Sequence, residues 1–369
     1  MAPVALDEYP LHQTPLSMRY VASSDRNFYD RCYFNAHDRT GDIFLITGAG
    51  IYPQLGVKDA YVVVRRGDLQ HVVRMSDALD DERLSLRVGP YSVDVVEPLR
   101  KIHLVCDADS DGIGFDLTWR GAFPAIDEER HLLRTGIRPI LDTWRFAQLG
   151  TWEGEIRVAG DTIAVSPDTW VGSRDRSWGI RPIGEAEPAG KPVDGAADFG
   201  FWWLYVPVKF DDYAIVLIAQ EDGTGHRTLN DAVRVHPDGR IDQLGWPRVK
   251  IHYRSGTRIP EGAAIALTEP DGSPLVMEID CLAHVPLHVG CGYGGDPDWS
   301  HGAWRGPKWI EGSTYDFTDP DVASRTPWGV IDHVGRATIN GDVGWGLFEH
   351  GTMGRHLPSG FTDFLSVSQ

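Results

Sequence analysis

The segment from Asp168 to Pro182 reads Asp-Thr-Trp-Val-Gly-Ser-Arg-Asp-Arg-Ser-Trp-Gly-Ile-Arg-Pro and lies near the middle of the 369-residue chain. If this segment is extended, successive side chains point in opposite directions. Arg174, Arg176 and Trp178 then share one face of a strand, and Asp175 lies on the other face between two serines. From residue types alone, a surface strand whose arginines pair with neighbouring acids is as good an interpretation as a binding site.

An internal repeat gives this segment its significance. When the sequence is shifted by 172 residues, apolar runs and single residues of the first half fall on similar ones in the second half. One shift serves both ends of the repeat without a net gap, which indicates a duplicated unit. The matching positions are 42–46 with 214–218, Tyr33 with Tyr205, Asp59-Ala60 with Asp231-Ala232, Val171-Gly172 with Val343-Gly344, and Gly179 with Gly351.

The chain is predicted to be an all-β protein. Short alternating segments end at turn residues throughout both halves, and the 41 glycines and 24 prolines leave only one short helix candidate, Ile126 to Leu133. We therefore expect two tandem antiparallel β-barrel domains related by internal duplication. The first domain covers residues 1–186, including an N-terminal surface arm, and the second covers 187–369, with a linker over 184–195 that is rich in Gly and Pro.

Bulk composition excludes several classes of function. A net charge of −18 argues against binding to nucleic acid or to an anionic membrane surface, since both require clustered Lys and Arg. The sequence contains no run of eighteen apolar residues, so we expect no membrane span, and its first residues do not resemble a secretory signal. Four scattered cysteines are typical of a reduced, cytoplasmic protein. The sequence leaves the oligomeric state open, a dimer included.

A short motif resembles a known family. Gly-Ser-Arg-Asp-Arg-Ser-Trp-Gly (172–179), followed by the aromatic strand Phe-Trp-Trp-Leu-Tyr (201–205), is similar to sequences of the lipocalin-like double-barrel superfamily. That superfamily includes carotenoid 1,2-hydratase (hydroxyneurosporene synthase), AttH-like proteins and certain fungal Diels–Alderases. Its recurring pattern is an Asp followed three positions later by Trp-Gly, which Asp175, Trp178 and Gly179 match here.

The resemblance implies two lipocalin-like (calycin-like) barrels that hold a hydrophobic substrate in or between them, without a metal or an organic cofactor. It further implies hydration, isomerisation or cyclisation of that substrate. We accordingly expect a cofactor-independent lyase (hydratase or carbon–carbon lyase) or isomerase that acts on a terpenoid, steroid or aromatic small molecule. The alternative is a non-catalytic carrier of an apolar ligand, with the same fold and pocket.

Candidate site residues follow from the chemistry that such a reaction needs. Asp175 is the expected general acid or base if it is buried, with Arg174, Arg176 or Arg181 holding an oxygen or carboxylate of the substrate. If the flanking arginines instead clasp Asp175, its pKa falls and it becomes a structural anion. Glu349 and His350 form a second acid–base candidate, although a lone His is more often structural. The residues expected to line the pocket are Trp178, Arg181, Trp202, Trp203, Tyr205, Asn230, Asp231 and Trp299.

Several of these residues have an ordinary structural explanation. Any single aromatic ring more often fills a core, and Asn230-Asp231 is typical of a hairpin turn. The segment 107–112 imitates half of a calcium loop but lacks its final Glu, and the Cys and His residues between 281 and 291 have ligand-like spacing. We expect a turn and core residues there, and no metal site.

Overall fold

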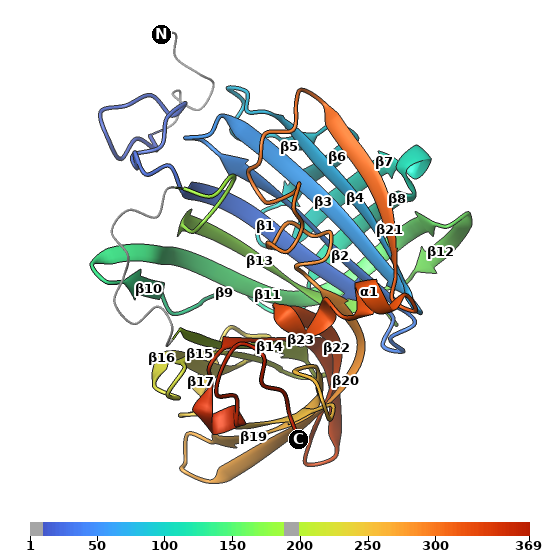
Figure 1. Cartoon of the computed structure of the whole chain (residues 1–369). Helices are drawn as coiled ribbons and strands as arrows, with labels where there is room; N and C mark the ends of the chain where they lie inside the picture. Colours follow the sequence, from blue (N-terminus) through green and yellow to red (C-terminus); the bar gives the residue numbers. More distant parts are fainter. Residues whose placement is uncertain (1–9, 188–198) are drawn as a thin grey trace.

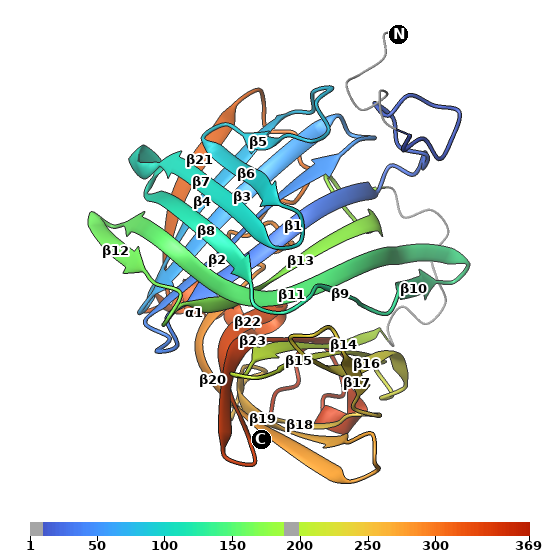
Figure 2. The same ribbon diagram turned by 180° about the vertical axis from the view of Figure 1, so that it is seen from behind.

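The fold is described from a computed structural model, over residues 10–187 and 199–369. Figures 1 and 2 show two curled antiparallel sheets, one above the other. The larger sheet contains the following strands in spatial order: β21 (Trp309–Asp316), β4 (Leu69–Ala78), β3 (Val57–Arg66), β2 (Ile43–Tyr52), β1 (Phe28–His37), β13 (Val171–Ile180), β11 (Arg138–Val158), β8 (Ile113–Gly121), β7 (Lys101–Ala108), β6 (Tyr91–Glu97) and β5 (Leu86–Val88). Three short strands pair with β11 beside this order: β9 (Ile126–Asp127), β10 (His131–Thr135) and β12 (Asp161–Val165).

The second sheet repeats the order of the first. Its strands are β17 (Ile241–Gln243), β16 (Arg227–Val235), β15 (Ala214–Asp222), β14 (Gly200–Lys209), β23 (Asp342–Gly354), β22 (Ile331–Ile339), β20 (Pro274–Pro286), β19 (Pro260–Thr268) and β18 (Arg248–Tyr253). Strand β14 occupies the place of β1 and β23 that of β13, and β1 and β14 begin at Phe28 and Gly200, at the 172-residue offset of the sequence repeat. The predicted all-β fold of two tandem antiparallel barrel-like units is confirmed.

Two details of the chain differ from the simple repeat. Strand β21 belongs to the second half of the sequence but pairs with β4 at the edge of the first sheet. The helix predicted over 126–133 is wrong, because these residues form β9 and β10, which pair with β11 and so satisfy their backbone groups in the sheet. The one α-helix among the described residues is the single turn α1 (Pro320–Ala323). The division at residues 186 and 187 stays a prediction, and most of the predicted linker lies outside the described residues.

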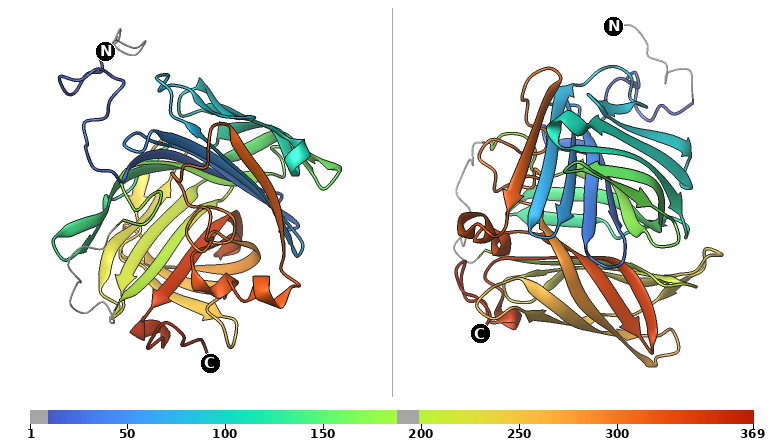
Figure 3. Two further views of the ribbon diagram at one scale, coloured as in Figure 1. Left: turned by 45° about the horizontal axis from the view of Figure 1, so that its top comes forward. Right: turned by 90° about the vertical axis from the view of Figure 1, so that its right-hand side faces the viewer.

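The three largest hydrophobic clusters of the described residues hold the sheets together. One fills the curl of the first sheet and another fills the curl of the second. The third lies between the sheets, where the outer face of one packs on the outer face of the other (Figure 3). It contains buried side chains from both, among them Phe44, Ile46 and Leu149 from the first and Val216, Ile218 and Leu347 from the second. Because this seam is as well buried as either barrel interior, polar groups within it are shielded from water.

None of the helices in the described part of the chain has the length and apolar character that crossing a membrane would require.

Candidate functional site

The central strand β13 places its polar residues on two faces, as its alternation predicts. Asp175 lies opposite Tyr33 of β1 and Ala147 of β11, so it is in the middle of the sheet and on the face that meets the second sheet. Ser177 is on the same face, and both residues line a cavity there. The neighbouring arginines consequently point toward the interior of the first barrel.

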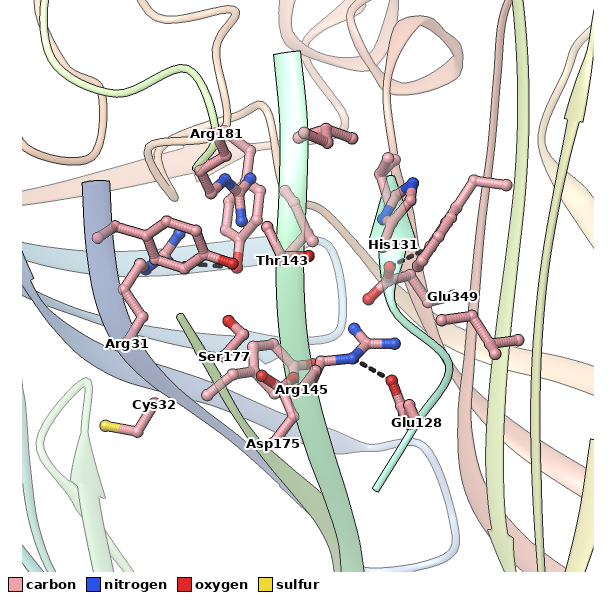
Figure 4. Close-up of a pocket in the computed structure, with 18 of the residues that line it drawn as sticks. Arg31, Cys32, Glu128, His131, Thr143, Arg145, Asp175, Ser177, Arg181 and Glu349 are labelled. Atoms are coloured by element: carbon pink, nitrogen blue, oxygen red, sulfur yellow. Dashed lines mark hydrogen bonds and ion pairs between the residues drawn. The ribbon is translucent and has the colours of Figure 1, made fainter. Parts of the chain in front are cut away.

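A cavity of about 170 Å³ lies in the seam between the two sheets. Its volume is close to the roughly 150 Å³ of an engineered apolar cavity that binds benzene, so it accommodates one ring. Figure 4 shows acidic, basic and aromatic side chains gathered around it from several strands. Those lining it include Tyr29, Arg31, Tyr33, Glu128, Glu129, His131, Leu141, Thr143, Arg145, Asp175, Ser177, Arg181, Phe201, Trp203, Ile218, Leu287, Tyr293, Val330 and Glu349.

Asp175 is an acid of this cavity whose carboxyl group is free to contact a bound molecule. Its side chain makes no hydrogen bond or ion pair with any residue of 10–187 or 199–369, and burial raises its pKa above the ordinary 3.8. The guanidinium groups of Arg145, Arg31 and Arg181 act in the opposite direction and limit that rise. An acid with a raised pKa and a free carboxyl facing a cavity is suited to exchange a proton with a bound molecule.

Glu128 and Arg145 form an ion pair in the cavity wall, in which the Arg145 Nε–H donates to the buried Glu128 carboxylate (Figure 4). Burial raises the pKa of Glu128 to about 7, although Arg145 lowers it. The Arg145 guanidinium also lies 4.2 Å from the centre of the Tyr205 ring, a cation–π contact that links the two sheets. Glu128 is thus poised to change its protonation near neutral pH.

Glu349 and Asp332 supply two more acids from the second sheet. They lie directly opposite each other on β23 and β22, and burial raises the pKa of both. Glu349 raises the pKa of Asp332 further, whereas Arg145 limits the rise at Glu349. The indole N–H of Trp203 donates to Glu349, and the hydroxyl of Tyr33 donates to Asp332 Oδ2 at 2.5 Å. The second of these bonds crosses the seam, because Tyr33 belongs to the first sheet.

The duplication places an acid in the same position of each sheet. Tyr33 lies opposite Asp175, and its counterpart Tyr205 lies opposite Glu349. A shift of 172 residues carries Asp175 onto Leu347 instead, so the last strand of the second unit pairs two residues out of step with the first. Both acids therefore point into the seam from opposite sides of it.

Among the predicted site residues, Asp175, Glu349, Arg181 and Trp203 line the cavity, and Tyr205 is buried beside it under Arg145.

The predicted substrate contacts of Arg174, Arg176 and Trp178 are not supported, because the pleat of β13 turns them to the other face. Arg174 is buried, and its Nε–H donates to Gln148 Oε1 at 2.9 Å. Arg176 pairs with Asp30 at 3.0 Å, and Trp178 is exposed.

His350 and Trp202 also lie away from the seam, within the core of the second barrel. The His350 Nδ1 contacts the backbone carbonyl of Trp203 at 2.6 Å, and burial lowers its pKa to about 3. Trp202 stacks on His356 at a ring distance of 5.7 Å. Glu349 and His350 therefore point to opposite faces of β23 and do not form the predicted acid–base pair.

The remaining predicted residues surround the site at a distance. Asn230 accepts a hydrogen bond from Arg227. Asp231 is half-buried near Glu129, and both burial and that neighbour raise its pKa. Trp299 is buried and stacks on Trp309 at 5.3 Å, behind the cavity wall.

Five further residues that line the cavity were not predicted from the sequence: Glu128, Arg145, Arg31, His131 and Tyr293. Glu128 and His131 fall in the segment predicted as a helix, and Arg145 lies on the 21-residue strand β11. The alternation along β11 was the available signal, since Thr143 and Arg145 both point to the seam and Ala147 follows them on the same face.

No group of three or more His, Cys, Asp or Glu side chains within the described residues is arranged to hold a metal ion. The calcium-like segment 107–112 includes a 3-10 turn after β7, and Cys281 and Cys291 pack against different cores.

Comparison with known proteins gives a family and a fold. Residues 4–362 match the model of a family of unknown function (DUF8625). No curated protein matches the chain.

Solved structures with the same fold include a candidate AttH protein from Nitrosomonas europaea, with a TM-score of 0.54 and 12% identity over 95% of this chain and 99% of that one. Kievitone hydratase from Nectria haematococca follows with a TM-score of 0.50 and 14% identity, over 87% of this chain and 88% of its own. CghA has a TM-score of 0.52 and 13% identity, over 88% of each chain. The predicted resemblance to the lipocalin-like double-barrel superfamily is confirmed in the fold.

Proposed function

We propose that this chain is a cofactor-independent lyase or isomerase that acts by acid–base chemistry on a hydrophobic small molecule. The chain belongs to the family of unknown function DUF8625. The substrate is a terpenoid, steroid or aromatic compound, one ring of which occupies the cavity between the sheets. Hydration of a carbon–carbon double bond, or the reverse dehydration of an alcohol, is the favoured reaction, and the occurrence of a hydratase among proteins of this fold supports that choice.

The observation that carries the proposal is Asp175, a half-buried carboxyl group in the seam that faces the cavity without a partner in the described residues. Burial favours its protonated form, so Asp175 gives a proton to the substrate carbon or takes one from it. In the hydration direction the new C–H bond receives the proton of Asp175, and water supplies the hydroxyl group.

A second acid is needed to accept the proton that the attacking water loses. Glu128 serves this role, since its pKa of about 7 allows it to take up a proton near neutral pH. Arg145 positions the Glu128 carboxylate through their ion pair. Trp203 lines the cavity and holds Glu349 through its indole N–H, while its own ring stacks on His131 and contacts the Arg145 guanidinium.

The test uses the protein with a panel of cyclic alkenes, enones and tertiary alcohols in D₂O, with products read by mass spectrometry. Hydration adds the mass of one D₂O, dehydration removes one water, and isomerisation introduces deuterium at a carbon. We expect Asp175→Asn to fold and to lose at least about 100-fold in rate, as is usual when a general acid or base is removed.

Asp30→Asn is the matched control, because Asp30 lies on the neighbouring strand β1 and pairs with Arg176 away from the cavity. Full turnover by Asp175→Asn would exclude the proposed role. A ligand that remains bound through purification and is returned chemically unchanged would instead identify a non-catalytic carrier.

A further inference from the structure

Two arginines meet at one end of the seam cavity, away from the Glu128–Arg145 pair. Arg31 comes from β1, and Arg181 follows the end of β13. The ring of Tyr293 contacts both: its centre lies 5.2 Å from the guanidinium carbon of Arg31 and 5.6 Å from that of Arg181. Figure 4 shows Arg31 and Arg181 on the same side of the cavity. Arg181 also lies 5.5 Å from the centre of the Tyr29 ring.

Neither arginine has an acidic partner. Within residues 10–187 and 199–369, no carboxylate lies within ion-pair distance of Arg31 or Arg181, in contrast to Arg145, which Glu128 neutralises. The Arg31 side chain is only 4% exposed, and its Nε–H has no hydrogen-bond acceptor. A buried guanidinium with an unused N–H donor lowers the stability of the folded protein unless an anion accepts a hydrogen bond from it.

A chain of hydrogen bonds holds Arg31 in place without neutralising it. Its Nη2 donates to Nε2 of His301 at 2.8 Å, and the other ring nitrogen of His301 lies 3.3 Å from Asp59 Oδ2. Burial lowers the pKa of His301 to about 4, so its ring is neutral at pH 7. The neutral ring separates the Arg31 guanidinium from the Asp59 carboxylate. The Asp59 carboxylate is already engaged by the hydroxyl of Tyr52 at 2.9 Å and by the amide of Gly302 at 2.8 Å.

A second cavity continues from this end. It has a volume of about 550 Å³ and shares Leu141, Arg181 and Tyr293 with the inner cavity. The arginines therefore mark the passage between an inner chamber that fits one ring and an outer space that admits the rest of a larger molecule. Asp175 lies on the inner side of this passage.

We propose that the substrate is a carboxylate: Arg31 and Arg181 bind its monoanionic carboxylate group, while its ring lies in the inner cavity against Asp175. This inference rests on the proposed function and names its substrate class. Guanidinium groups match the planar, two-oxygen geometry of a carboxylate. A dianion such as a phosphate monoester is less suitable, because Asp175 and Glu128 lie in the same small cavity and would repel the second charge.

The test compares two probes of the same shape, 2-naphthoate and 2-naphthamide, in calorimetric titrations of the whole protein at pH 7. The wild-type protein should bind 2-naphthoate at least about 10-fold more tightly than the neutral amide, since a hydrogen bond to a charged group outweighs a neutral one. Arg181→Met and Arg31→Lys should each reduce this preference by about 10-fold or more. Arg174→Met is the matched control, because Arg174 is a buried arginine without an acidic partner on the opposite face of β13.

Equal affinity for the two probes, no binding of 2-naphthoate, or an unchanged preference in folded Arg181→Met overturns the inference. Binding also separates it from the proposed catalysis. Asp175→Asn should keep or increase the affinity for 2-naphthoate, because it removes an acid near the bound carboxylate, even if it abolishes turnover. Loss of the carboxylate preference with turnover intact would reject the anion site alone.

Discussion

The stability of the protein should depend on pH through Glu128, and Glu128→Gln should remove that part of the dependence. Burial raises the pKa of this carboxyl from 4.5 to about 7 in the folded protein. Between pH 4.5 and pH 7, the Glu128 carboxyl therefore carries a proton in the folded protein but not in the unfolded chain. The free energy of unfolding contains the full contribution of this proton below pH 4.5 and loses it as the pH rises through 7.

The magnitude follows from the size of the shift. One pKa unit corresponds to about 1.4 kcal/mol, so ionising Glu128 in the folded protein costs roughly 3 kcal/mol. Between pH 5 and pH 8 the free energy of unfolding of the wild-type protein should decrease by about 2.5 kcal/mol more than that of Glu128→Gln. Absolute stabilities will also differ because Arg145 loses its charged partner, but this loss does not generate the slope.

Unfolding in guanidinium chloride at pH 5, 6, 7 and 8 measures the effect, with the free energy of unfolding obtained by linear extrapolation. Glu129→Gln is the matched control, because Glu129 is the adjacent residue, also lines the cavity and is exposed. Its pH profile should parallel that of the wild type. If the profile of Glu128→Gln is parallel as well, Glu128 is not held in the buried environment described, and its role as proton acceptor is refuted.

Further substitutions test the packing of the seam and of its central strand by guanidinium unfolding at pH 7. Arg145→Met should destabilise the protein by about 3–5 kcal/mol, because it leaves Glu128 buried without a cation. Arg174→Met should stay within about 1 kcal/mol of the wild type, because burial without an acidic partner already lowers the pKa of this arginine to about 10. Gly172→Ala should cost at least about 2 kcal/mol, because the added methyl carbon would lie 1.9 Å from the backbone oxygen of Asn35, and a smaller loss would contradict the close approach of β13 to β1.

The fold was predictable because the features that determine it are local or periodic. Alternating apolar residues indicate strands wherever a sheet has one buried face, and the 172-residue repeat survives because both copies need the same buried positions. The short helix predicted over 126–133 was wrong because its composition allowed a helix, whereas pairing with the long strand β11 decided the structure. Likewise, nothing local in 309–316 indicates that this segment crosses over to the edge of the first sheet.

The site was predictable only in part. Alternation correctly separates Asp175 from Arg174 and Arg176, but it does not say which face of β13 meets the second sheet. Glu349 was expected at the site, although β23 pairs with β14 two residues out of step with the repeat. Glu128 and Arg145 meet because β9 pairs with β11, and the helix predicted over 126–133 concealed that pairing.

The central claim is that Asp175 is a proton-exchanging acid in a cavity between the two sheets. Carbon-13 NMR titration of aspartate-labelled protein, with the Asp175→Asn spectrum used for assignment, measures it most directly. We predict that the Asp175 carboxyl titrates above 3.8 and that its resonance shifts when 2-naphthoate binds. A carboxyl that titrates at or below 3.8 and does not respond to the ligand would contradict the claim.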